Sequence, residues 1–502
     1  MPKPVLHVHA KTATDELALA LAALPERFGL VREFADAATA EALHAIAALQ
    51  LPSIDLTHLP FLTIDPAGST DLDQAMHIET HGSGYRVFYA IADVPAFVVP
   101  GGALDAEARH RGQTIYAPDG RIPLHPAVIS EGAASLLAGQ ERSAFVWEIA
   151  LDAEGEITST TVTRARIRSR QQLSYEQAQS ALDTAQPSET LRLLKVVGTA
   201  RIELERQRGG ASLNLPSVEI EEVGNAESGG GYRLVRRSPL PIEDWNAQIS
   251  LMTGMAAAQL MLGARIGLLR TMPQPEPATI TSFRHQTHAL GHPWPEDMPY
   301  GEYLRTLDLQ DPRELAIMHA AGSLFRGAGY TAFDGTAPAN TMQAAVAAPY
   351  AHVTAPLRRL VDRFTLVLCA AICANEPVPQ WVSDALTELP GLMTSSDQKE
   401  GALSRAAIDA VEAAVLSRRV GEVFTATVIS AGTGSSGSAT AGNGAANGRG
   451  RIQLTDPAVT ARCTGNLTAG TVISVRLVEA TIETGIVSFE AVSTSQHELI
   501  AN

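Results

Sequence analysis

Cysteines, aromatic residues and long apolar runs are all scarce in this chain. Three cysteines among 502 residues are too few for a disulfide framework, and they favour a reducing compartment. The longest apolar run in a helical pattern, Thr365–Ala374, is far shorter than the ~20 residues that cross a bilayer. The opening residues also lack the basic segment and apolar core of a secretory signal. We therefore expect a cytoplasmic protein that does not span a membrane.

Basic residues are outnumbered by acidic ones. The 38 Lys and Arg residues against 54 Asp and Glu residues give a net charge of −16, which excludes a protein that coats nucleic acid with its whole surface. A local basic channel stays possible. Alternate positions in one short segment hold Arg164, Arg166, Arg168 and Arg170, so an extended strand would place all four on one face. Such a stripe fits nucleic-acid contact and a solvated face with scattered counter-ions equally well.

The pattern along the chain predicts an α+β protein of roughly three domains. Two helix patterns lie within residues 14–50 and predict a small helical N-terminal domain over 1–54, as either a helix-turn-helix-like module or a packing cap. Strands mixed with long helices follow over 55–420. Short strands over 421–502 predict a barrel of the OB type, with Phe424 and Phe489 in its core and a mobile Gly/Ser-rich loop at 431–450.

The segment FLTIDPAGSTDLDQAMHIE concentrates three carboxylates at one loop. Asp65 ends an apolar β-like run, and Asp71 and Asp73 lie two residues apart, so an extended backbone points both the same way. Carboxylates held close together either raise one another's pKa or bind a cation, and oxygen ligands suit Mg²⁺ or Mn²⁺. Two such ions about 3.5–4 Å apart can promote phosphodiester cleavage. The alternative is that these aspartates only form turns and cap helices.

A second segment, PYAHVTAPLRRLVDRF, supplies donors for an anion. We expect Arg358 and Arg359 at the start of a helix that opens with Pro356, where free N–H groups and the dipole favour a phosphate. A guanidinium there can clamp a phosphate bidentately. The alternative is an exposed arginine pair that answers Asp362 at helical spacing.

Together, TIDPAGSTDLD and YAHVTAPLRRLVD resemble the paired signatures of the ribonuclease II (RNB) exoribonuclease family. Three segments between them resemble the family's catalytic domain in the same order: Gln113–Phe145, Arg166–Leu182 and Ser238–Leu260. The resemblance covers about residues 55–420. It implies a mixed α/β catalytic domain with a narrow funnel to the acidic site, flanked by OB barrels that guide RNA.

The resemblance also implies an activity. Members of this family hydrolyse single-stranded RNA processively from its 3′ end with Mg²⁺, for which Mn²⁺ can substitute, and release nucleoside 5′-monophosphates. By motif match, Asp65, Asp71 and Asp73 take the positions of the metal-binding aspartates, and Arg358 that of the arginine near the scissile phosphate. We expect a monomer with little sequence specificity.

Two of the remaining RNA contacts follow from the same match. Tyr116 takes the position of a tyrosine that stacks on a terminal base, and Tyr175 that of a channel tyrosine. Stacking on tyrosine grips any base without sequence preference. Further donors to RNA are expected from the second segment: His352, Thr354 and Arg359.

Three departures from the family pattern bear on activity. Gln74 stands where relatives carry a fourth aspartate, and an amide oxygen can ligate a metal but brings no negative charge. The alternative function is therefore a catalytically weak RNA-binding protein with a degenerate metal site. The family's glutamate before the barrel has two candidates here, Asp409 and Glu412. The N-terminal 55 residues or so are too few for the paired cold-shock barrels that many relatives carry.

Overall fold

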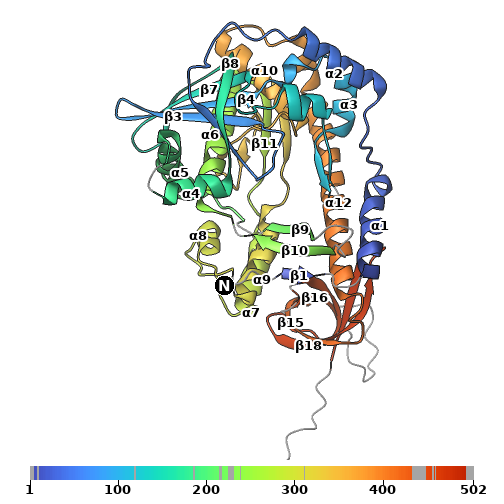
Figure 1. Cartoon of the computed structure of the whole chain (residues 1–502). Coiled ribbons are helices and arrows are strands. Elements are labelled where there is room, and N and C mark those ends of the chain that lie inside the picture. Colours follow the sequence, from blue (N-terminus) through green and yellow to red (C-terminus); the bar gives the residue numbers. More distant parts are fainter. Residues whose placement is uncertain are drawn as a thin grey trace, which may run out of the picture.

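The structure is a computed structural model. It describes residues 5–7, 11–117, 120–184, 187–213, 217–223, 231–237, 239–309, 311–431, 448–454, 457 and 459–492. Two closed five-stranded barrels lie at opposite ends of the molecule, joined by the long helix α12 (Leu389–Leu416) (Figure 1). The mixture of helices and strands confirms the expected α+β class. Within the described ranges, no helix has the length and apolar character of a membrane span.

The first barrel is a meander closed on itself. Its strands, in spatial order, are β2 (Phe61–Asp65), β3 (Gln74–His81), β4 (Gly84–Ala92), β7 (Glu141–Leu151) and β8 (Ile157–Ser174). Successive strands pair antiparallel, and the closing pair of β2 with β8 is parallel. Tyr89 and Trp147 face each other across β4 and β7 and are both buried. Burying two large aromatic side chains in this core stabilises the barrel strongly.

Helices cover this barrel and form one large apolar cluster with it. Among those that share the cluster are α4 (Tyr175–Asp183), α5 (Glu189–Gln207), α6 (Pro241–Ala264), α10 (Leu360–Ala374) and α11 (Gln380–Ala385), together with the start of α12. A smaller group comprises α3 (Ala103–Arg111), the hairpin β5 (Ile115–Ala117) and β6 (Gly120–Ile122), and the π-helical turn η2 (Val128–Ala133). This second group supports the loop between β2 and β3.

The basic stripe on β8 is neutralised by its surroundings. Arg164 pairs with Asp93 at 2.8 Å, and Arg166 pairs with Asp55 at 2.6 Å. Arg168 pairs with Glu141, and Arg170 donates to a backbone carbonyl. Residues between these arginines are buried, so the four do share the outer face of the barrel. The stripe could have contacted nucleic acid or formed a solvated face with counter-ions, and this geometry fits the face with counter-ions.

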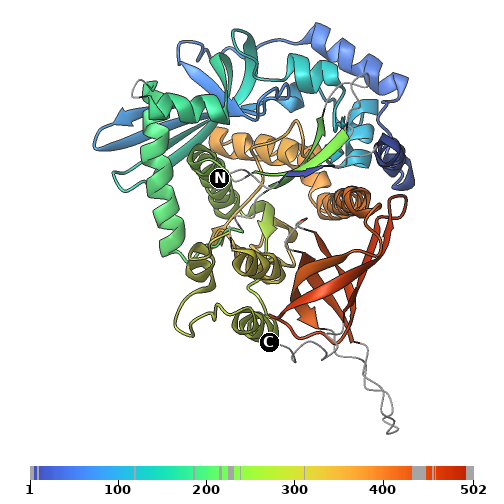
Figure 2. The same cartoon turned by 60° about the horizontal axis from the view of Figure 1, so that its bottom comes forward.

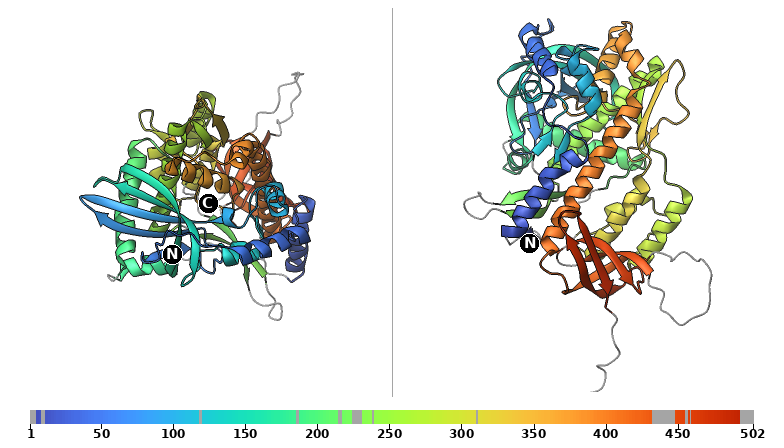
Figure 3. Two further views of the ribbon diagram at one scale, coloured as in Figure 1. Left: turned by 90° about the horizontal axis from the view of Figure 1, so that it is seen from above. Right: turned by 90° about the vertical axis from the view of Figure 1, so that its right-hand side faces the viewer.

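The two N-terminal helices pack into different clusters. Helix α1 (Lys11–Arg27) lies along α12, where Leu17 and Leu21 join a cluster with Leu403 of α12 (Figure 3, right). Helix α2 (Asp36–Ala48) instead packs Ala38 and Ala42 into a cluster with the first barrel. Each short apolar stripe is therefore buried by a larger neighbouring surface rather than by the other helix. The choice between a helix-turn-helix-like module and a packing cap stays a prediction.

The second barrel has the strand order of an OB fold. Its strands are β15 (Val423–Ala431), β16 (Gly448–Leu454), β17 (Thr460–Gly465), β18 (Val472–Thr481) and β19 (Ile486–Ala491), ordered β15-β16-β17-β19-β18 and closed (Figure 2). Phe424 and Phe489 are buried in its core with ring centroids 5.7 Å apart, as expected. The loop expected at 431–450 lies almost wholly outside the described residues.

Smaller sheets and a further group of helices complete the fold. The strands are β1 (Val5–His7), β9 (Ser217–Val223) and β10 (Gly231–Arg237) in one sheet, and the pairs β11 (Ile266–Thr271) with β12 (Gly329–Asp334) and β13 (Met342–Gln343) with β14 (Ala348–Pro349). The helices are α7 (Pro277–Ala289), α8 (Tyr300–Arg305) and α9 (Pro312–Ala321), whose cluster includes Ile429 of β15. This contact attaches the second barrel to the middle of the molecule.

Candidate functional site

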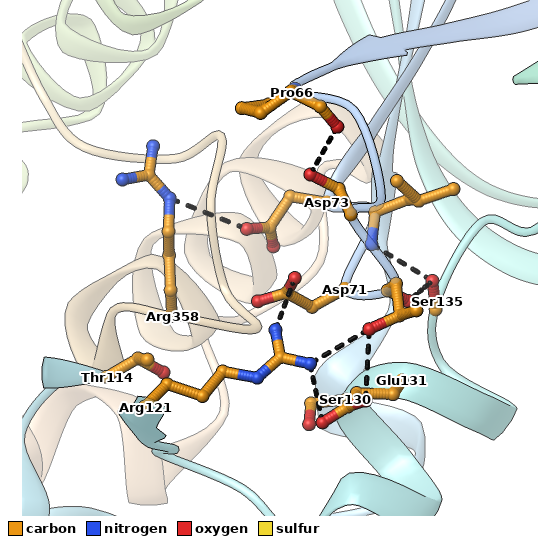
Figure 4. A network of polar contacts seen from close by, with 12 residues as sticks. Pro66, Asp71, Asp73, Thr114, Arg121, Ser130, Glu131, Ser135 and Arg358 are labelled. Atoms are coloured by element: carbon orange, nitrogen blue, oxygen red, sulfur yellow. Dashed lines mark hydrogen bonds and ion pairs between the residues drawn. The ribbon is translucent and has the colours of Figure 1, made fainter. Parts of the chain in front are cut away.

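The acidic loop runs from the end of β2 to the start of β3. Leu72 is fully buried, and this directs its two neighbours, Asp71 and Asp73, to the other side of the backbone. The Ser135 hydroxyl fixes the loop, because it accepts the Leu72 N–H at 3.0 Å and donates to the Thr70 carbonyl at 2.7 Å. The loop therefore presents its carboxylates in a defined conformation (Figure 4).

The basic segment meets this loop from almost 300 residues away. The Leu357 N–H donates to Asp73 Oδ1 at 2.8 Å, and Arg358 Nε lies 3.7 Å from Asp73 Oδ2. Asp73 is only 4% exposed, whereas the side chain of Arg358 is 48% exposed. The two segments predicted to form one site are thus in direct contact, and Arg358 keeps an accessible guanidinium.

The helix expected from Pro356 begins four residues later, at Leu360. Residues 358–360 pair with the segment after α3 instead: Thr114 donates to the Arg358 carbonyl at 2.9 Å, and Leu360 donates to the Gly112 carbonyl at 3.0 Å. Gly112 adopts φ +73°, and a Cβ there would lie 2.6 Å from Ser396 Cβ of α12. Both the turn and the close approach therefore require glycine. This long-range pairing holds Arg359 in extended backbone, and Arg358 lies in the turn just before it.

Arg359 turns inward. Its guanidinium donates twice to Asp362, at 2.9 and 2.8 Å, and Asp362 also accepts the Ala355 N–H at 2.7 Å. Asp362 is fully buried. The sequence allowed an ion pair with Asp362 for both arginines, and the structure shows it for Arg359 only. This ion pair stabilises the loop that carries Arg358.

The acidic loop carries more negative charge than its protein partners neutralise. Burial, together with the nearby Asp71 carboxylate, raises the pKa of Asp65 to about 7. Burial also raises the pKa of Asp73 well above its ordinary value, although Arg358 opposes this. Asp65 Oδ2 is buried without a hydrogen-bond partner among the described residues. An orphaned buried carboxylate oxygen beside two further aspartates fits a hard divalent cation such as Mg²⁺.

Asp71 is engaged elsewhere, by Arg121 of β6. Arg121 Nη1 lies 2.6 Å from Asp71 Oδ1, and Nη2 lies 2.6 Å from Glu131 Oε1 (Figure 4). Arg121 also donates to Thr70 Oγ1 at 2.8 Å. No group of three or more acidic, histidine or cysteine ligands is preassembled within the part of the chain that the structure describes. Sequence reasoning missed Arg121 and Glu131, and the only available signal was the position of Arg121 in the same segment as Tyr116.

The two predicted stacking tyrosines lie near different acids of the loop, Tyr116 near Asp71 and Tyr175 near Asp65. Tyr116 of β5 is 53% exposed; desolvation and the charge of Asp71 raise the pKa of its hydroxyl to about 12. Tyr175 is the first residue of α4, and burial followed by the charge of Asp65 raises its pKa. Its side chain hydrogen-bonds Asn246 of α6, which also donates to the Ile64 carbonyl at 3.5 Å. Both phenols are therefore neutral and close to the acidic loop, and their contact with RNA stays a prediction.

Gln74 bridges the two halves of the site. Its Nε2 donates to the Thr354 carbonyl, and Thr354 Oγ1 accepts from Ser250 at 2.8 Å. Thr354 is 3% exposed, so its hydroxyl is already bonded inside the protein. His352 Nδ1 lies 2.8 Å from the Tyr330 hydroxyl, and burial followed by the charge of Arg359 keeps its pKa well below the ordinary range. A metal contact for Gln74 and RNA contacts for Thr354 and His352 stay predictions.

Of the two candidates for the glutamate before the barrel, Asp409 faces the second barrel. It lies against Gly485, and Arg451, Arg405 and Arg462 counteract the rise that burial causes in its pKa. Asp409 therefore contacts the second barrel, and the choice between Asp409 and Glu412 stays a prediction.

Two parts of the chain match models of known protein families. Residues 53–374 match the model of the RNB domain, and residues 422–492 match that of the RNase II-type exonuclease C-terminal S1 domain. Over 342 residues the chain is 30% identical to a probable exosome complex exonuclease RRP44 of Caenorhabditis elegans, covering 65% of this chain and 35% of that protein. Over 333 residues it is 32% identical to ribonuclease R of Escherichia coli, covering 62% of this chain and 39% of that protein.

A solved structure has the same fold. Mycoplasma genitalium RNase R in complex with ribose methylated single-stranded RNA superposes with a TM-score of 0.78 at 19% identity, covering 95% of this chain and 78% of that one. The aligned region spans little more than a third of the curated relatives, 35% and 39% of their lengths.

Proposed function

Because this chain belongs to the RNB family, we propose that it is a Mg²⁺-dependent, processive 3′→5′ exoribonuclease that hydrolyses single-stranded RNA to nucleoside 5′-monophosphates. The observation that carries the proposal is the contact between the acidic loop and the basic segment, in which Asp73 accepts from Leu357 and lies beside Arg358. This contact joins a cation-binding group and a phosphate-binding group, which are the two halves that phosphodiester hydrolysis needs.

The carboxylates would hold the metal. Asp65, Asp71 and Asp73 would be the ligands, with Gln74 as a further oxygen donor, and Mg²⁺ when bound would supply activation of the attacking water and stabilisation of the leaving oxygen. Asp73 is oriented by the Leu357 N–H, and the acidic loop is held by Ser135. Side chains fixed in this way lose little entropy when the cation binds.

Arg358 supplies the positive charge on the phosphate side. Its side chain is 48% exposed and lies next to the acids, so it can reach the phosphoryl oxygens as negative charge develops on them. Arg359 contributes indirectly, because its bidentate bond to Asp362 stabilises the loop. Tyr116 and Tyr175, which lie near these acids, would grip bases by stacking, and this would allow activity on RNA of any sequence.

The substrate assignment is supported by the family and the second barrel. The Caenorhabditis elegans relative is named a probable exosome complex exonuclease, and the S1 domain matched at 422–492 is of the RNase II exonuclease type. We expect the enzyme to act as a cytoplasmic monomer. Cys369, Cys373 and Cys463 are all unpaired, in keeping with a reducing compartment.

The test is a time course with a 5′-labelled single-stranded RNA in Mg²⁺. We expect a ladder that shortens from the 3′ end with nucleoside 5′-monophosphate as product. EDTA and Asp73→Asn should both abolish it, and the surface variant Asp55→Asn should leave it intact. A 3′-blocked RNA separates this activity from an endonuclease, because only an endonuclease would cut it internally. Intact RNA at protein concentrations that shift it in a gel would contradict the proposal and favour an RNA-binding protein with a degenerate metal site; Gln74→Asp would then test that alternative.

A further inference from the structure

Arg121 bridges the acidic loop and the helical turn η2. It is bonded on one side to Asp71 and on the other to Glu131, with 2.6 Å at each contact. The side chains of Arg121, Asp71 and Glu131 are 27%, 16% and 30% exposed, so the network is largely shielded from water. A bridging guanidinium held at both ends is ordered, unlike the isolated surface pairs that contribute little.

The same residue connects the acids to the predicted base platform. Tyr116 and Arg121 lie directly opposite each other in the β5–β6 hairpin. Directly opposed side chains of an antiparallel pair are neighbours on the same face. The ion pair with Asp71 therefore ties the hairpin that carries Tyr116 to the acidic loop.

The charges of the network point to a role for this arginine in metal binding. Asp65, Asp71, Asp73 and Glu131 bring four carboxylates, and Arg121 and Arg358 bring two guanidiniums. The two uncompensated negative charges equal the charge of one divalent cation. A guanidinium bonded to a metal-ligand carboxylate repels that cation, and it also holds the carboxylate in one orientation.

We propose that Arg121 is a positioning residue that serves as the internal counter-ion of the acidic site: it fixes Asp71, restrains the affinity of the site for divalent cations, and docks the Tyr116 hairpin on the acidic loop. This inference rests on the proposed function, in which Asp71 is a metal ligand and Tyr116 holds the RNA end. The inference predicts that removing the positive charge of Arg121 strengthens Mn²⁺ binding and weakens RNA binding.

Arg121→Gln keeps a hydrogen-bond donor beside Asp71 but removes the positive charge. Loss of repulsion should tighten Mn²⁺ binding about tenfold, since like charges a few ångströms apart interact strongly in a shielded site. The released hairpin should weaken binding of single-stranded RNA severalfold. Arg121→Lys retains the charge and should keep the metal affinity near that of the wild type. If Arg121 had a purely structural role, both Arg121→Gln and Arg121→Lys would bind Mn²⁺ and RNA more weakly than the wild type.

The experiment measures binding in the full chain without turnover. Mn²⁺ affinity is read from the paramagnetic resonance signal of free Mn²⁺, and RNA affinity from the fluorescence anisotropy of a labelled single-stranded RNA in EDTA. The matched control is Arg166→Gln, which removes an arginine paired with Asp55 at the same 2.6 Å on the outside of the barrel. In a double-mutant cycle, Arg121→Gln and Tyr116→Ala should have less than additive effects on RNA binding, because both act through one hairpin.

Several outcomes would overturn the inference. Unchanged or weaker Mn²⁺ binding in Arg121→Gln, with the circular dichroism spectrum of the wild type, contradicts a counter-ion role. Additive effects of Arg121→Gln and Tyr116→Ala contradict docking of the hairpin. If the wild type binds Mn²⁺ and degrades RNA, either of these two results contradicts the role proposed for Arg121 and leaves the proposed function intact. If the wild type binds Mn²⁺ but does not degrade RNA, the proposed function fails while the Mn²⁺ comparison still decides the role of Arg121.

Discussion

Asp65→Asn should stabilise the metal-free protein at alkaline pH. Asp65 ends β2 with one carboxylate oxygen buried and unpartnered among the described residues, and burial with the Asp71 charge raises its pKa from 3.8 to about 7. A carboxyl whose pKa is raised by folding contributes stability below its unfolded pKa, and this contribution is lost as the pH rises towards 7. The asparagine does not titrate, so the variant escapes that loss.

The size of this stabilisation follows from the rise in the pKa of Asp65. A rise from 3.8 to about 7 corresponds to about 4 kcal/mol at about 1.4 kcal/mol per pKa unit. The free energy of unfolding of Asp65→Asn should therefore exceed that of the wild type by about 4 kcal/mol at pH 8. At pH 5 most of the difference should vanish, leaving about 1–2 kcal/mol.

Urea unfolding in EDTA, followed by tryptophan fluorescence, measures this difference. Trp147 is fully buried in the same barrel as Asp65 and reports on its unfolding. Added Mg²⁺ should stabilise the wild type and leave Asp65→Asn unchanged, because only the wild type keeps the ligand. The control is Asp55→Asn. Hydrogen bonds from Thr57 and Arg166 lower the pKa of Asp55 to about 2, so this variant should lose stability above pH 4 instead.

A difference between Asp65→Asn and the wild type that is the same at pH 5 and pH 8 would refute the reasoning. It would mean that the Asp65 carboxylate is as well solvated in the folded protein as in the unfolded chain.

Three further predictions concern the scaffold of the site. Arg363→Met should lower the free energy of unfolding by about 3 kcal/mol, because Arg363 and Asp105 form a buried ion pair and the carboxylate would lose that partner; urea unfolding checks this. Ser135→Ala removes both hydrogen bonds that hold the acidic loop, and it should weaken Mn²⁺ binding with a cost in stability of about 1–3 kcal/mol; an unaltered Mn²⁺ titration would contradict it. Leu17→Ala should cost about 2–5 kcal/mol, because Leu17 is fully buried against α12; RNA degradation at low temperature should persist if α1 is a packing cap.

Local pattern was sufficient for most of the elements. The OB-type barrel and the acidic loop were predictable because alternation and turn residues act over a few positions. Leu72 between Asp71 and Asp73 is such a case, since burying one residue of an extended triplet directs the other two outward. The two signatures could also be assigned to one site, because their resemblance to the family covers both.

Prediction failed where a distant segment competed with local preference. A helix from Pro356 was the expected structure, yet residues 358–360 pair with residues 112–114 and the helix starts at Leu360. The N-terminal helices show the same limit. Their apolar faces were visible in the sequence, but which surface buries each face depends on packing against α12 or the first barrel.

The sequence alone thus determined the type of most elements, the side of them that is buried, and the identity of the acids and the arginine that face each other. The tertiary structure alone decided the partners of those groups. Arg121 and Ser135 reach the acidic loop from 50 or more residues away, and Arg359 turns to Asp362 while Arg358 stays exposed. The reason is physical: periodicity acts over neighbouring residues, whereas the charge and hydrogen bonds around a carboxylate depend on which distant segments packing brings beside it.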